Sequence, residues 1–171
     1  MTAIPEGRLW FAATGEFLMD PNALVHLRNA VESGHEPCIP TNGQLFTQEL
    51  IGEILAIGVR MIRFSVDAYD PETYWKIRRG GELAKMVSAR QYLRSRKKDY
   101  PELRVEVNNA FFRKTFGEQE RFLAFWRGLV DAVNFNAEYY NTFQFSARLL
   151  KRMRLELYRR LPLSSGSSYQ M

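Results

Sequence analysis

The chain has 171 residues and a net charge of +5, and 46% of its residues are hydrophobic while 25% are charged. This balance suits a single globular domain with one core. No apolar run is long enough to span a membrane, residues 1–6 do not form a secretory signal, and a single cysteine excludes an internal disulfide, so the expected compartment is a reducing cytoplasm.

Short apolar or alternating runs, typical of strands, alternate with helical patterns along the chain. Strands are predicted at residues 9–13, 37–40, 61–66, 103–107 and 132–135. Helices are predicted at residues 21–33, 48–57, 71–78, 83–96 and 118–129. Asp20, Thr47 and Asp70 are the predicted N-caps, because their side-chain oxygens can accept hydrogen bonds from free backbone N–H groups. Pro37 and Pro40 argue against a long central strand at 37–40.

About five β–α units in series imply an α/β fold with parallel strands joined by right-handed crossovers. A partial barrel and an open doubly wound sheet are both compatible with this order. The core domain is predicted at residues 1–145, followed by a basic helix at 146–160. The tail at 161–171 is rich in Ser and Gly, and we expect it to be disordered.

In either architecture, ligands bind where parallel strands end. The residues at four successive strand ends are small or polar. They are Gly15-Glu16, Thr41-Asn42-Gly43, Ser65-Val66-Asp67 and Asn108-Asn109. Polar residues also start turns, so turn formation alone can explain any one of these ends. Four such ends in succession favour a shared binding site.

Three of these ends, together with a fourth segment at 74–80, form a series of motifs in a fixed order. The motifs are Gly15-Glu16-Phe17-Leu18-Met19-Asp20-Pro21, Thr41-Asn42-Gly43, Ser65-Val66-Asp67-Ala68 and Tyr74-Trp75-Lys76-Ile77-Arg78-Arg79-Gly80. Over residues 8–140 the chain resembles the radical S-adenosylmethionine (SAM) superfamily, most closely its SPASM-associated branch. The resemblance implies an incomplete (β/α) barrel, SAM and a [4Fe-4S] cluster as cofactors, and a peptide or protein substrate.

The resemblance also implies which residues contact SAM. Gly15 corresponds to the position where the backbone passes close to the methionyl part. Glu16 corresponds to the carboxylate near the SAM ammonium group, although it could instead be an acid that favours a helix dipole. Ser65 corresponds to a polar position near the ribose or carboxylate of SAM, and Asp67 is expected to orient its neighbours.

Two further residues complete the predicted cofactor site. Arg78 is a candidate partner for the SAM carboxylate, because a guanidinium pairs with a carboxylate through two hydrogen bonds. An exposed arginine at a helix end is the alternative. Asn109 could hydrogen-bond the adenosine part of SAM. Thr41-Asn42-Gly43 is expected to shape its turn. The sequence identifies no catalytic residue.

The chain departs from the family pattern at the iron–sulfur cluster. The family loop C-x-x-x-C-x-x-C supplies three thiolates, and SAM occupies the fourth iron. Cys38 is the only cysteine, and neither His26 nor His35 precedes Gly15. We expect Cys38 to be a small buried residue and the chain to hold no metal. Because only residues 1–7 precede the Gly-Glu strand, we expect a truncated protein that is inactive as given.

Two other functions remain open. The chain could be a non-catalytic domain that binds an adenosyl ligand, or a basic nucleic-acid-binding protein. The second idea comes from cations at 94–98 and 151–160, although both clusters are expected at helix ends, where cations favour the helix dipole. A barrel without its first strand exposes a sheet edge, so we also expect self-association.

Overall fold

The computed structural model describes residues 7–12, 15–110 and 118–136. The chain divides into two units, 1–136 and 137–171, and all described residues belong to the first. The predicted basic helix at 146–160 and the predicted tail at 161–171 therefore lie outside the described residues. The strands are β1 (Arg8–Trp10), β2 (Glu36–Thr41), β3 (Met61–Ser65), β4 (Arg104–Ala110) and β5 (Ala132–Asn136). The helices are η1 (Phe17–Met19), α1 (Ala23–Glu32), α2 (Gln48–Ile57), α3 (Pro71–Ile77), α4 (Leu83–Arg96) and α5 (Gln119–Trp126).

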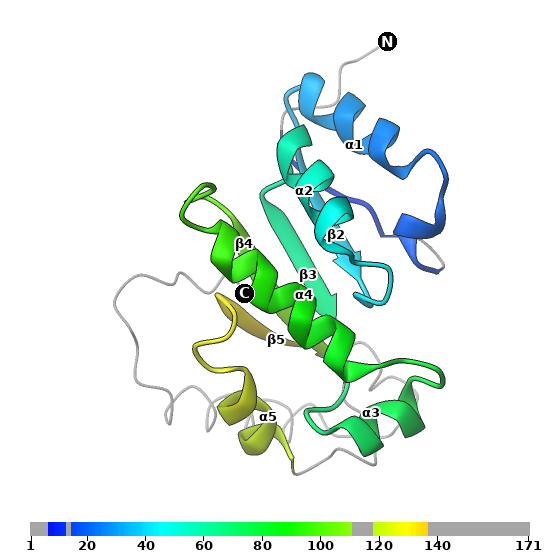
Figure 1. The fold of residues 1–171 in the computed structure, drawn as a ribbon, viewed down its shortest axis with the longest axis vertical. Helices are drawn as coiled ribbons and strands as arrows, with labels where there is room; N and C mark the ends of the chain where they lie inside the picture. The colour runs from blue at the N-terminus through cyan, green and yellow to red at the C-terminus, as the bar shows by residue number, and fades with distance from the viewer. Residues whose placement is uncertain (1–6, 13–14, 111–117, 137–171) are drawn as a thin grey trace, which may run out of the picture. The chain divides into compact units, whose positions relative to one another are not determined.

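The five strands form one parallel sheet in the order β1-β2-β3-β4-β5. Every crossover therefore moves one position in the same direction. Right-handed crossovers that all advance in one direction place their helices on the same face of the sheet, and α1, α2 and α4 lie together on one side of the strands in Figure 1. A doubly wound sheet would reverse its strand order. The prediction of an incomplete parallel (β/α) barrel is confirmed, and the doubly wound alternative is wrong.

The core lies between this helical layer and one face of the sheet. Ile39, Ile62 and Val105 are partners across β2, β3 and β4, so their side chains share a face. They pack in one buried cluster with residues of five helices, α1 to α5. The helical members include Leu27 of α1, Ile54 of α2, Met86 and Leu93 of α4, and Phe122 and Trp126 of α5. The opposite face, which carries Arg63 and Glu106, is called the inner face below.

Strand β2 is longer than its prolines suggested. The backbone groups of even-numbered residues in β2 point toward β1. The Glu36 N–H donates to the Gly7 carbonyl, and the Cys38 carbonyl accepts from the Phe11 N–H. The backbone nitrogen of Pro40, which has no hydrogen to donate, also points toward β1, but the pairing with β1 ends at Cys38. The backbone nitrogen of Pro37 points toward β3, but the pairing of β2 with β3 begins only at Cys38. Each proline therefore lies where a neighbouring strand is absent, which explains why the strand tolerates both.

The predicted helix starts are correct at two of three sites. The side chain of Thr47 accepts from the Leu50 N–H, and that of Asp70 accepts from the Thr73 N–H. The third prediction is wrong, because Asp20 accepts instead from the Asn22 N–H at 2.8 Å and the helix begins only at Ala23. The predicted helix at 83–96 matches α4. The first strand is shorter than expected, with three exposed residues.

Among the strands that the structure describes, β1 lies at the edge of the sheet and pairs only with β2. Its residues Leu9 and Trp10 are 36% and 39% exposed. A strand edge with unpaired backbone groups and apolar side chains favours pairing with another chain.

We therefore expect the protein to self-associate in a concentration-dependent manner, as measured by size exclusion with light scattering. Leu9→Lys places a charge on the edge and should shift the protein toward monomer. Val25→Lys changes an exposed apolar residue of α1, distant from the edge strand in sequence, and should leave association unchanged. A native protein that stays monomeric across the concentration range would contradict the prediction.

Candidate functional site

The carboxyl ends of the parallel strands meet at one edge of the sheet, here called the carboxyl edge. Glu16 follows β1, Asn42 follows β2, Asp67 follows β3, and Asn109 lies near the end of β4. A direct contact joins the first two ends, because Glu16 Oε2 accepts a hydrogen bond from the Asn42 N–H at 2.7 Å. Residues far apart in sequence are thus brought together at one edge.

Only one of the two carboxylate oxygens of Glu16 accepts a hydrogen bond from the described residues. Its Oε2 atom is held by Asn42, whereas its Oε1 atom is buried and has no hydrogen-bond partner in the described part of the chain. A buried carboxylate oxygen without a donor is costly, so a ligand that brings an N–H group would be stabilised there. The preceding Gly15 has φ +122°, a conformation that a side chain would strain, and the space beside it is open.

Side chains in the turn after β2 form hydrogen bonds to the backbone of the same turn. Thr41 Oγ1 accepts from the Gly43 N–H at 3.0 Å, and Asn42 Oδ1 accepts from the Gln44 N–H at 2.9 Å. A side chain at Gly43 would meet the ring of Phe64 at 2.9 Å. This segment shapes its turn, as the sequence indicated, and its backbone positions Glu16.

Asp67, Arg78 and Asn109 form a connected group across β3 and β4. Asp67 is fully buried; its Oδ2 binds Arg78 Nε at 2.5 Å and its Oδ1 accepts from the Ala110 N–H at 3.1 Å. Asn109 Nδ2 donates to the Val66 carbonyl at 3.0 Å. The sequence did not predict that Arg78 pairs with Asp67, because the two residues are 11 positions apart and are separated by a loop and a helix.

Ser65 lies at the end of β3, opposite Asn108 of β4. Both side chains are half-buried, and neither has a hydrogen-bond partner among the described residues. By alternation, Ser65 is on the inner face together with Arg63. It therefore lies between the carboxyl edge and the polar groups of the inner face.

A small hollow with room for about one water molecule also lies at the carboxyl edge. It is bounded by Asp67, Tyr69, Asn109, Glu118 and Phe122, together with Ala68 and Gln119. The Oε2 atom of Glu118 is buried and has no hydrogen-bond partner in the described part of the chain. Sequence analysis placed Glu118 only at the start of a helix. The hollow is smaller than typical ligand pockets, so by itself it does not define a binding site.

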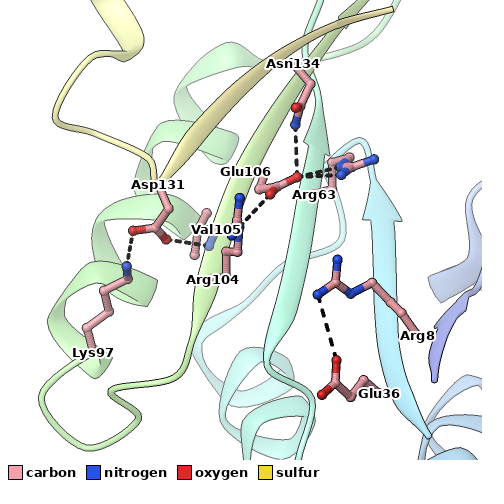
Figure 2. Close-up of polar contacts among 9 residues, drawn as sticks. All are labelled: Arg8, Glu36, Arg63, Lys97, Arg104, Val105, Glu106, Asp131 and Asn134. Atoms are coloured by element: carbon pink, nitrogen blue, oxygen red, sulfur yellow. Dashed lines mark hydrogen bonds and ion pairs between the residues drawn. The ribbon is translucent and has the colours of Figure 1, made fainter. Parts of the chain in front are cut away.

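The inner face of the sheet holds a second polar group, which Figure 2 shows around Glu106. The Glu106 side chain is 3% exposed. Its Oε2 accepts from Arg63 Nη2 at 2.6 Å, from Arg63 Nε at 2.9 Å and from Asn134 Nδ2 at 2.9 Å, while its Oε1 accepts from Arg104 Nε at 2.6 Å. The Arg63 guanidinium also lies 4.0 Å from the ring centroid of Trp10. Sequence analysis assigned no function to these residues.

The residues present do not fit an iron–sulfur cluster. Cys38 is fully buried in β2, and burial raises the pKa of its thiol from 9.0 to about 12, despite the opposing effect of Arg63. The thiolate that an iron would need is therefore disfavoured. His26 lies 3.3 Å from Asp20. Within residues 7–12, 15–110 and 118–136, no three His, Cys, Asp or Glu side chains are placed to hold a metal ion.

The described basic cluster serves the fold. Arg94 Nη1 donates to the Gly128 carbonyl at 3.2 Å, and Lys97 pairs with Asp131 (Figure 2). Arg96 pairs with Asp99 at 3.2 Å. The contacts of Arg94 and Lys97 attach the end of α4 to the segment that leads into β5, whereas the Arg96–Asp99 pair is local. None of the described helices is both long and apolar enough to cross a membrane.

Comparison with known proteins gives structural matches only. No protein-family model matches the sequence, and no curated protein matches it. SuiB of Streptococcus suis bound to S-adenosylmethionine matches with a TM-score of 0.63 and 12% identity, over 89% of this chain and 34% of SuiB. SuiB bound to its precursor peptide SuiA matches with a TM-score of 0.62 and 16% identity, over 90% of this chain and 35% of SuiB.

A structure of TYW1 with a lysine–pyruvate adduct matches with a TM-score of 0.60 and 14% identity, over 88% of this chain and 49% of TYW1. The chain thus spans about a third of SuiB and about half of TYW1. At these identities the matches show a shared fold, and the fold is the one that the sequence resemblance implied.

The Asp67–Arg78 pair leads to a stability prediction. Asp67→Asn should lower the free energy of unfolding by about 2–3 kcal/mol, because it removes a buried acceptor of charged hydrogen bonds. Urea denaturation followed by circular dichroism measures the change. Asp99→Asn removes one partner of an exposed pair and should cost less than about 1 kcal/mol. Equal, small losses in both variants would show that the buried pair is not structural.

Proposed function

We propose that the chain is a radical SAM-type domain that holds S-adenosylmethionine at the carboxyl edge of its sheet. The observation that carries the proposal is the unpartnered, buried Oε1 atom of Glu16. The SAM ammonium group is a charged donor suited to that atom. The order of the sequence motifs and the fold shared with a protein solved with SAM support the same assignment.

The remaining predicted residues take supporting roles in this proposal. Gly15 leaves space for the methionyl part of SAM, and the free hydroxyl of Ser65 contacts the ribose or carboxylate. Arg78 uses only its Nε atom for Asp67, which leaves both Nη atoms for the SAM carboxylate. Asp67 orients Arg78, and Asn109 is proposed to bind the adenosine part.

We further propose that this polypeptide alone does not cleave SAM. A cluster, when bound, would supply the electron that breaks the carbon–sulfur bond of SAM. The chain offers one thiol for such a cluster, and that thiol is buried and held protonated. Modification of a peptide or protein, as in the SPASM-associated branch, remains the proposed activity of a complete enzyme. SuiB has been solved with a precursor peptide.

The second candidate function is a non-catalytic domain for adenosyl ligands, and the absence of cluster ligands favours it. Nucleic-acid binding receives less support. Arg94 and Lys97 of the described basic cluster are engaged with Gly128 and Asp131. Cations held by the fold have less freedom to contact phosphates.

Equilibrium dialysis with radiolabelled SAM up to millimolar concentration tests the cofactor site. Without a chelating iron we expect weak binding, and Glu16→Gln should weaken it about tenfold, which corresponds to about 1.4 kcal/mol. 5′-Methylthioadenosine lacks the amino acid part, so its affinity should not change in this variant. Glu53→Gln, on the exposed side of α2, is the control. Equal affinity of the native protein and Glu16→Gln for SAM would contradict the role of Glu16.

Anaerobic reconstitution with iron and sulfide tests the lack of cleavage. We expect no stoichiometric cluster, as measured by iron content and absorbance, and no 5′-deoxyadenosine from SAM under reducing conditions. Cys38→Ala should behave like the native protein in both assays. A stable cluster that is lost in Cys38→Ala, or 5′-deoxyadenosine produced by the native protein, would overturn this part of the proposal.

A further inference from the structure

We propose that the inner face of the sheet binds an extended acidic peptide, and that Arg104 and Arg63 contact a carboxylate of that peptide. This inference goes beyond SAM binding and specifies the kind of peptide that the chain would recognise. It rests on the proposed function only for the idea that a peptide is the substrate. The groups that carry it lie around Glu106 in Figure 2.

The inner face carries polar and charged side chains that the described helices leave accessible. The core residues of α1, α2, α4 and α5 pack in a cluster with the other face of the sheet. On the inner face, Trp10 is 39% exposed and the Arg104 side chain is 47% exposed. A face with exposed cations and an exposed aromatic ring is typical of a surface that contacts a partner.

The charges on this face do not balance. Three arginines (Arg8, Arg63 and Arg104) share the face with two glutamates, Glu36 and Glu106. Glu106 already accepts hydrogen bonds from two arginines, and one carboxylate neutralises only one guanidinium. The described part of the inner face therefore carries one more positive than negative charge, and the exposed Arg104 side chain suits an anionic partner.

The free donors suit a carboxylate. Arg104 uses only Nε for Glu106, so both of its Nη atoms are available. Arg63 uses Nε and Nη2, which leaves Nη1. A guanidinium binds a carboxylate through two parallel hydrogen bonds, and the Trp10 ring under Arg63 holds that guanidinium in a fixed plane.

The extent of the face favours a peptide over a small acid. From β1 to β5 the sheet spans about 19 Å, given strands about 4.8 Å apart. An extended peptide of about six residues covers that distance at about 3.3 Å per residue. Ser65 and Asn108 lie two residues from Arg63 and Glu106 along their strands, toward the carboxyl edge, and have unused hydrogen-bonding groups for a peptide backbone.

The segment 137–171 is itself rich in Lys and Arg, so its charge does not complement the inner face.

Fluorescence anisotropy with a labelled ten-residue peptide tests the inference. The peptide carries two central Glu residues, and a matched peptide carries Gln at both positions. The native protein should bind the Glu peptide at least tenfold more tightly. Arg104→Gln should lose at least fivefold of that affinity, while an unchanged SAM affinity shows that the variant is folded.

Two control variants test whether the effect is local. Arg28→Gln removes an exposed positive charge from α1, and Lys151→Gln removes a positive charge from the basic stretch at 151–160 of the sequence. Both should retain binding of the Glu peptide. Equal binding of the two peptides, an equal loss in Arg28→Gln or Lys151→Gln, or no binding of either peptide would overturn the inference. Because SAM binding is measured separately, failure of the peptide site is distinguishable from failure of the cofactor site.

Discussion

Consecutive parallel pairing of five strands is the constraint on which the rest of the structure depends. When every crossover is right-handed and advances by one strand, the helices cover one face and all carboxyl ends reach one edge. Glu16 can therefore contact Asn42, and Asp67 can contact Ala110, although each pair is distant in sequence. Among residues 7–12, 15–110 and 118–136, the same arrangement places no helical layer on the inner face. Its buried charge, Glu106, is satisfied there by residues of the neighbouring strands.

Local patterns in the sequence were sufficient to predict most of the elements, although not η1 or the start of α1. The helix at 83–96 and the caps at Thr47 and Asp70 depend on interactions within a few residues, and all were correct. The choice between a barrel and a doubly wound sheet depends on strand order, which is a long-range property. The tolerance of β2 for two prolines depends on where its neighbours end, and a single strand does not contain that information.

The candidate site shows the same division. Motifs placed Glu16, Ser65, Asp67 and Asn109 at strand ends, but hydrogen-bond partners were not predictable from the motifs. The network around Glu106 was missed because an alternating strand favours the assignment of its polar residues to solvent. One signal was present, since Arg63 and Glu106 carry opposite charges on consecutive predicted strands and prove to be paired in register. Such complementary charges would be worth testing in other parallel sheets.

The account requires that a ligand completes the coordination of Glu16 at the carboxyl edge. The most direct measurement is a two-dimensional amide NMR spectrum of the isotope-labelled protein, recorded during titration with S-adenosylmethionine. The account predicts that the amide signals of Gly15, Asn42 and Val66 shift with a common affinity, while those of Arg60 and Lys97 at the opposite end of the sheet stay in place. Shifts confined to the opposite end, or no shifts at saturating ligand, would contradict it.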